Sequence, residues 1–133
     1  KMHHCVVTAQ QSQELTHLIR ELADEENLHD CILNCSLDSG HVRANRFLLC
    51  MSSPVLRRMF CGGFRESFSG EVTIEEVSSA SLQRTLQLWV GNEIVADSLE
   101  DLMSIGVVAD RFEMKPVLDA VEDAMRRALH ADE

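Results

Sequence analysis

The sequence predicts a helix-rich α+β domain in which a small β-sheet packs against a cluster of short helices. Two short apolar segments, 30–37 and 41–44, flank the turn Asp38-Ser39-Gly40, which is the pattern of a β-hairpin. Apolar residues at helical spacing occupy most of the remaining chain. The total length of 133 residues is that of one domain.

The domain is expected to occupy residues 12–130, between a loose leader over 1–11 and a short tail over 131–133. From Ser12, which can cap a helix, apolar residues recur at i, i+3, i+4 and i+7. This spacing predicts a short helix with one apolar stripe, ending at the acidic segment 24–27. The stripe consists of Leu15, Leu18, Ile19 and Leu22.

Two short helices and a strand are expected after the hairpin. Residues 46–51 are almost wholly apolar and predict a buried helix. Ser53-Pro54 predicts the start of a second helix, because serine suits the N-cap and proline the first helical position. Gly62-Gly63 ends that helix. A polar loop over 64–70 and a short strand over 71–74 follow.

Three helices are expected in the last part of the chain. The first begins at Ser78 and ends with Trp89 and Val90 on its apolar face; residues 93–95 form at most a brief strand. The second begins in a capping box at Ser98, and the third begins at Pro116. The residues predicted to face inward are Leu99, Leu102, Met103, Gly106 and Val107 in the second helix, and Val117, Leu118, Val121, Ala124, Met125, Ala128 and Leu129 in the third.

The charge balance bears on the class of partner. The chain carries 12 Lys+Arg against 22 Asp+Glu, a net charge of −10. Direct nucleic-acid binding is not expected, because phosphate recognition needs clustered cations. No apolar run approaches the ~18 residues of a membrane helix, so no membrane partner is expected. No signal peptide is visible. Because the chain starts at Lys1, we expect a fragment of a longer protein.

The cysteines indicate a reducing compartment. Their number is odd, so they cannot all pair within one chain, and Cys31, Cys50 and Cys61 have the apolar neighbours typical of buried thiols. We therefore expect a cytoplasmic or nuclear protein, or one found in both places. A zinc site is the alternative, although structural zinc more often takes cysteines presented closer together by a turn. Its ligands are His29, Cys31, Cys35 and His41.

Catalytic motifs are not visible. The chain has no glycine-rich phosphate loop, no paired-histidine zinc helix and no nucleophile elbow. No nucleophile, base and orienting group suggest themselves together, so we expect neither an enzyme nor a cofactor. The residues by themselves indicate an interaction domain.

A series of short segments carries a more specific indication. These are residues 28–33, 42–49, 52–60, 63–67, 71–74, 86–91, 109–114 and 121–125. Each is weak alone, but in this order and spacing they resemble the BTB/POZ domain family over roughly residues 12–130. The resemblance implies the family's fold, a small sheet against a helical cluster, which agrees with the predicted order of elements.

The resemblance also implies a dimerisation and adaptor module. The implied dimer surface consists of Leu15, Leu18, Ile19 and Leu22, with Asp30 and Arg46 at the family's acidic and basic positions near the interface. The alternative is that this stripe packs on its own domain. Asn45 replaces the family's usual histidine, and Trp89-Val90-Gly91 replaces Tyr-Thr-Gly.

Many members of the family bind cullin-3 and serve as substrate adaptors of a ubiquitin ligase. Their contact loop carries a hydrophobic residue, any residue and a glutamate, and Phe64-Arg65-Glu66 matches it at the family's position. The alternative is that Phe64 folds back on Met59 or Phe60. The resemblance thus implies a homodimer that binds cullin-3, with its substrate recruited through a domain outside this chain.

Two other functions fit the same family. One is the dimerisation domain of a transcription regulator that recruits corepressors, and the other is an oligomeric scaffold domain. Kelch repeats after residue 133 would favour the adaptor, and zinc fingers would favour the transcription regulator.

Overall fold

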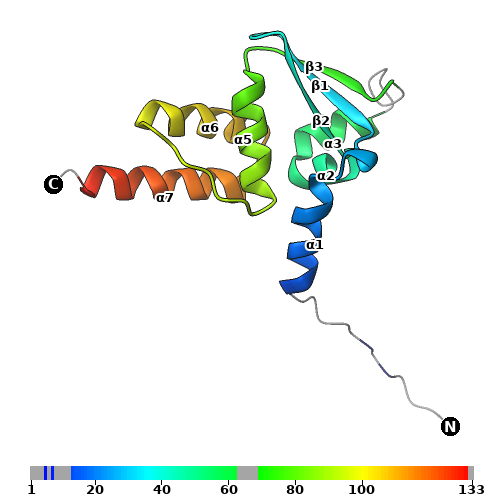
Figure 1. The fold of residues 1–133 in the computed structure, drawn as a ribbon, viewed down its shortest axis with the longest axis horizontal. Helices are drawn as coiled ribbons and strands as arrows, with labels where there is room; N and C mark the ends of the chain where they lie inside the picture. The colour runs from blue at the N-terminus through cyan, green and yellow to red at the C-terminus, as the bar shows by residue number, and fades with distance from the viewer. Residues whose placement is uncertain (1–4, 6, 8–12, 63–68, 132–133) are drawn as a thin grey trace.

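The computed structural model of the chain describes residues 5, 7, 13–62 and 69–131. In this part of the chain a small sheet and the helices α2 and α3 lie on one side of α5, and α6 and α7 lie on the other (Figure 1). The elements are α1 (Gln13–Ala23), the 3-10 helix η1 (Glu26–Leu28), β1 (Cys31–Cys35), β2 (Gly40–Ala44), α2 (Arg46–Ser52), α3 (Pro54–Cys61), β3 (Glu71–Ile74), α5 (Ser79–Trp89), α6 (Leu99–Arg111) and α7 (Lys115–Ala131).

The sheet of the described residues has three strands in the order β2-β1-β3. The predicted hairpin is present: β1 and β2 are antiparallel, with Cys31 opposite Ala44 and Cys35 opposite Gly40. β3 pairs with β1 in parallel, a geometry that requires a long connection. On β1 the side chains of Cys31, Leu33 and Cys35 are buried, so one face of the central strand forms the floor of the core.

Ser53 joins the two halves of the domain. Its hydroxyl oxygen accepts the backbone N–H of Leu56 at 3.1 Å, which caps α3 as the sequence predicts. The same hydroxyl donates to the backbone carbonyl of Phe112 at 2.6 Å, at the junction of α6 and α7. Ser53 is fully buried, so this bond fixes α3 against the far helices from inside the core.

The predicted burial of the segment 46–51 is only partly correct. The segment is helical, but Leu49 and Ser52 are the buried residues of α2, while Phe47 and Met51 are exposed. A helix of this length turns only one side to the core, and no other element of the described chain covers its outer side. Residues 93–95 form no strand, although a brief one was allowed for.

The predicted inward face of α6 is only partly correct, because Leu102 alone of its predicted large side chains packs against the core. The buried residues of that helix are Ile105, Val108 and Ala109, whereas Leu99, Met103 and Val107 are exposed. α6 carries two apolar stripes, and α5 and α7 cover only one of them. On α7 the prediction is better, because Val117 and Val121 are buried, but Leu129 near its end is exposed.

The cysteines are all described, and all are free thiols. Cys31 and Cys35 are buried and Cys50 is half-buried, but Cys61 at the end of α3 is exposed, contrary to the prediction. Within the described residues no three His, Cys, Asp or Glu side chains assemble as a metal site would need, so the zinc alternative gains no support. No helix of the described chain has the length and apolar character to cross a membrane.

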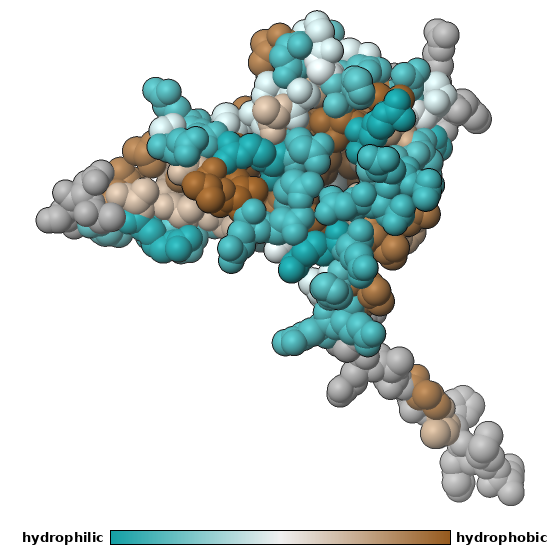
Figure 2. Space-filling model, viewed as in Figure 1, coloured by the Kyte–Doolittle hydropathy of each residue, from teal (hydrophilic) through white to brown (hydrophobic). Residues whose placement is uncertain are grey.

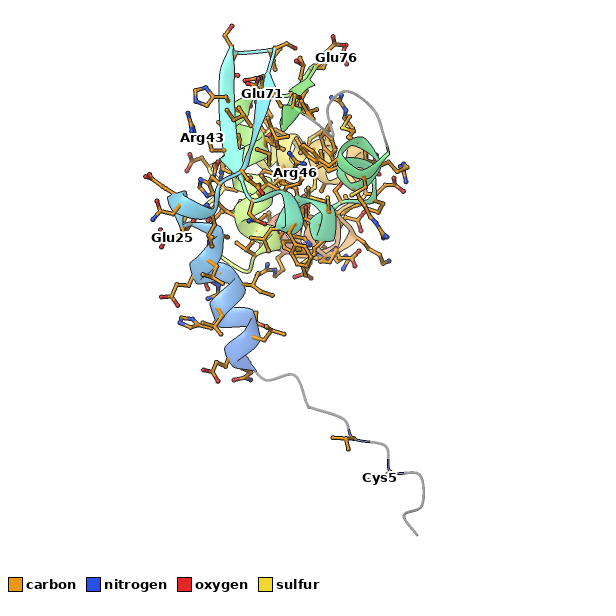
Figure 3. The ribbon with its side chains drawn as sticks, turned by 90° about the vertical axis from the view of Figure 1, so that its right-hand side faces the viewer. Cys5, Glu25, Arg43, Arg46, Glu71 and Glu76 are labelled. Atoms are coloured by element: carbon orange, nitrogen blue, oxygen red, sulfur yellow. The ribbon has the colours of Figure 1, made fainter. Side chains whose placement is uncertain are left out.

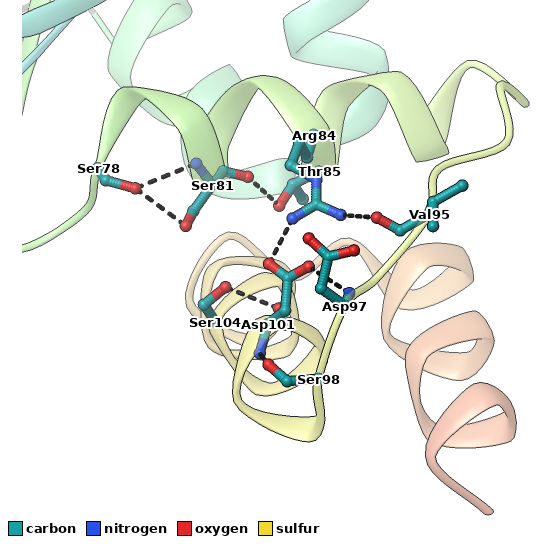
Figure 4. Close-up of polar contacts among 9 residues, drawn as sticks. All are labelled: Ser78, Ser81, Arg84, Thr85, Val95, Asp97, Ser98, Asp101 and Ser104. Carbon is teal, nitrogen blue, oxygen red and sulfur yellow. Dashed lines mark hydrogen bonds and ion pairs between the residues drawn. The ribbon is translucent and has the colours of Figure 1, made fainter. Parts of the chain in front are cut away.

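A polar network holds the irregular segment between α5 and α6 (Figure 4). Arg84 of α5 forms an ion pair with Asp101 of α6 and donates to the backbone carbonyl of Val95 at 2.5 Å. The other oxygen of Asp101 accepts the backbone N–H of Asp97 at 3.1 Å, and Ser98 caps α6. The hydrogen bond from Arg84, and next the one from Asp97, hold the pKa of Asp101 below its usual value.

This network predicts an acid-dependent loss of stability. Because the pKa of Asp101 is lowered in the folded chain, its stabilisation is present above the unfolded carboxyl pKa of about 3.9 and is lost as pH falls through the lowered value. In Asp101→Asn the fall in free energy of unfolding from pH 6 to pH 3, measured with urea, should therefore be smaller than in the wild type. Asp110→Asn, on an exposed carboxylate of the same helix, is the matched control. An equal acid-dependent fall in Asp101→Asn and the wild type would contradict the role of Asp101.

Candidate interaction surface

The first helix places its apolar stripe outside the core. α1 projects from the body of the domain (Figure 1), and none of its residues, all of which are described, is buried. The exposed fractions of Leu15, Leu18 and Leu22 are 40%, 42% and 47%, and Ile19 is half-buried. The stripe therefore lies outside the buried core of its own domain, with Ile19 as its most covered residue.

The end of α1 is nevertheless tied to the body. The guanidinium of Arg20 donates to the backbone carbonyl of Val90 at 3.4 Å, and the His29 ring lies 3.0 Å from the carbonyl oxygen of Ala23. These polar contacts fix where α1 leaves the domain, while the leucines of its apolar stripe remain exposed.

The stripe forms one wall of an apolar groove of about 390 Å³. The opposite wall comes from η1 and α2, where Leu28, Met51 and Phe47 are 41%, 49% and 71% exposed. Figure 2 shows hydrophobic residues, in brown, along the right-hand edge where α1 meets the body. Apolar side chains exposed together across three elements mark an interaction surface. The groove is lined by Leu15, Ile19, Leu22, Leu28, Asn45, Phe47, Leu48 and Met51; Leu18 lies on the stripe beside it.

Asn45 connects η1 and α2, the two elements that form the second wall of the groove. Its side-chain oxygen accepts the backbone N–H of Leu48 at 3.1 Å, which caps α2. Its amide nitrogen donates to the backbone carbonyl of Leu28 at 2.9 Å. One side chain thus caps the helix that carries Phe47 and holds the segment that carries Leu28. The asparagine that stands in place of the expected histidine therefore has a structural role of its own.

Asp30 and Arg46, the two residues expected near the dimer interface, contact each other through the backbone of Arg46. The Asp30 carboxylate accepts the Arg46 backbone N–H at 2.7 Å, at the start of α2. The Arg46 guanidinium lies over the Phe60 ring, 5.4 Å from its centre. Figure 3 labels Arg46 at the start of α2. Gly70 allows this arrangement, because its φ is +73° and a Cβ there would come within 2.9 Å of Arg46.

The two remaining predicted site residues, Phe64 and Glu66, lie outside the described residues. The structure adds Leu28, Phe47 and Met51 to the surface, and sequence reasoning missed them. For Phe47 and Met51 a signal was available: a helix of seven residues cannot bury an apolar side chain on every side.

The double role of Asn45 predicts a graded loss of stability. Asn45→Ala removes both hydrogen bonds and should lower the free energy of unfolding by about 1–2 kcal/mol, measured with urea. Asn45→Asp keeps an acceptor for Leu48 but loses the donor to Leu28, and should be intermediate. If Asn45→Ala has the same urea midpoint of unfolding as the wild type, the two Asn45 hydrogen bonds do not stabilise this part of the groove.

Comparison with known proteins finds one matching family and several similar proteins. The family described as BTB/POZ domain matches residues 19–129. Human Kelch-like protein 22 is 30% identical over 119 residues, which are 86% of this chain and 18% of that protein. BTB and MATH domain-containing protein 42 of Caenorhabditis elegans is 23% identical over 131 residues, which are 93% of this chain and 32% of that protein. The chain thus spans a fifth to a third of the length of these relatives.

Solved structures show the same fold. The BTB domain of human gigaxonin superposes with a TM-score of 0.70 at 14% identity, covering 91% of this chain and 98% of that one. The BTB domain of zebrafish PATZ1 gives 0.67 at 16% identity, covering 92% and 99%. These likenesses confirm the predicted α+β fold.

Proposed function

The chain belongs to the BTB/POZ domain family, and on that premise we propose that it forms a homodimer and recruits cullin-3 as an adaptor of a ubiquitin ligase. The family consists of protein-interaction modules rather than enzymes. Substrate recognition in this proposal falls to another part of a longer protein, since the relatives extend far beyond the matched region.

The exposed groove beside α1 is the observation that carries the dimer. An isolated helix as short as α1, with 11 residues, is marginal in water, so it needs a covering surface to be stable. A second copy offers a matching groove through a two-fold axis. The described residues that line the groove include no charged side chain, so a chain with a net charge of −10 can bury this surface against itself.

The proposed recruitment of cullin-3 is supported by the sequence of the chain, because the motif residues lie outside the described structure. Kelch-like proteins are among the relatives, and Phe64-Arg65-Glu66 matches the contact motif of the family's adaptors. An exposed aromatic side chain can fill a pocket of the partner while the neighbouring carboxylate sets the register. This assignment is a family-level analogy, and binding to the partner tests it directly.

The dimer proposal predicts the effect of one added charge. Leu22→Glu should weaken self-association at least about a hundredfold, because the carboxylate loses its hydration in the groove. Thr16→Glu adds the same charge to another exposed position of α1 and should leave the dimer intact. Sedimentation equilibrium at tens of micromolar measures both, and circular dichroism checks that the variants are folded. A monomeric wild type, or two variants that associate equally, would contradict the proposed surface.

The cullin-3 proposal predicts a selective loss of binding. Titration of the N-terminal region of cullin-3 should show that the double variant Phe64→Ala, Glu66→Ala binds more than about tenfold weaker than the wild type. Arg65→Ala changes the position at which the motif accepts any residue, and should bind normally. If the wild type does not bind, the adaptor proposal is wrong. If the double variant binds as tightly as the wild type, the contact residues are wrong.

A further inference from the structure

Two thiols meet at the surface formed by α2 and α3. Cys50 lies in the last turn of α2 and is half-buried, while Cys61 is the last residue of α3 and is exposed. Cys61 lies close enough to Cys50 to raise the pKa of the Cys50 thiol, second only to the effect of burial. Both also line one open pocket of about 600 Å³, so the pair is accessible to a small molecule.

The charges around this pocket favour an anion. Arg46 and Arg57 line it together with a single described carboxylate, Asp30. The Asp30 carboxylate already accepts the backbone N–H of Arg46. The described lining thus carries two guanidinium groups and one carboxylate, and this excess of positive charge contrasts with the net charge of −10 of the whole chain.

The other described cysteines are placed differently. Cys31 is buried, its thiol donates to the backbone carbonyl of Ala44 at 3.1 Å, and burial raises its pKa to about 12. Cys35 is buried as well, and burial raises its pKa. Burial also raises the pKa of Cys50, and the neighbouring Cys61 adds to this. Of the two thiols that line the pocket, Cys61 is the exposed one, so it meets a reagent first.

We propose that Cys50 and Cys61 form a reversible modification site at which an anionic low-molecular-weight disulfide of the glutathione class oxidises the pair to an intramolecular disulfide. The Cys61 thiolate attacks one sulfur of the reagent, whose S–S bond breaks and releases one thiol. Cys50 then loses its proton to solvent and attacks the sulfur of Cys61, which releases the second thiol. Two protein thiols are oxidised, and one small disulfide is reduced to two thiols. The proposal does not rest on the cullin-3 contact, although Phe47 and Met51 line both this pocket and the groove of the proposed dimer.

Mass spectrometry tests the pair. The chain carrying Cys5→Ser, which removes a separate exposed thiol, is treated with oxidised glutathione and quenched with acid. The product should be lighter by two hydrogen atoms, should yield a peptide that links Cys50 to Cys61, and should revert with dithiothreitol. Cys50→Ser should stop at a glutathione adduct on Cys61, and Cys61→Ser should react much more slowly. A glutathione adduct as the only product of the parent chain, a disulfide to Cys31 or Cys35, or an unreacted pair would overturn the proposal.

A second comparison tests the class of reagent. Oxidised glutathione, an anion, should react about threefold or more faster than cystamine, a cationic disulfide, as expected for one unit charge a few ångströms away in water. Arg57→Gln should reduce this preference without removing either thiol. Equal rates with the two reagents in the unsubstituted pocket would overturn the assignment to anionic disulfides.

Discussion

The position of β1 in the middle of the sheet is the constraint on which the rest of the structure depends. Its backbone is bonded on both sides: Asp30 donates to Ala44 of the hairpin at 3.1 Å, and Ile32 donates to Gly70 beside β3 at 2.9 Å. The segment before β1 therefore finds no open strand edge beside it, and it leaves the sheet as η1 and α1. The apolar stripe of α1 lies outside the core and forms one wall of the groove.

The fold could be predicted where the signals are local. Asp38-Ser39-Gly40 indicates the hairpin, and Ser53 and Ser98 mark the starts of α3 and α6, where each side chain does accept a backbone N–H. Burial is decided by distant parts of the chain, and there prediction was weaker. Val107 of α6 belongs to an apolar stripe as good as the one that α7 covers, and only the assembled helices select between them.

The sequence predicted one wall of the candidate surface but not the other. The stripe on α1 follows from its spacing, and its exposure agrees with a contact surface. The second wall depends on the hydrogen bond by which Asn45 holds Leu28 beside α2. The two residues are distant in sequence, so no local pattern predicts this contact. The approach of Cys61 to Cys50 is likewise a product of the angle between α2 and α3. The role of Phe64 and Glu66 stays a prediction from the sequence.

Hydrogen–deuterium exchange of α1 tests most directly the claim that a second copy covers this helix. The backbone amides of α1 should exchange more slowly as protein concentration rises through the range of dimer formation, because packing against a partner suppresses fraying of a short helix. The amides of α6 and α7, which pack within one chain, should show no such dependence. Exchange in α1 that is fast and independent of concentration would contradict the account.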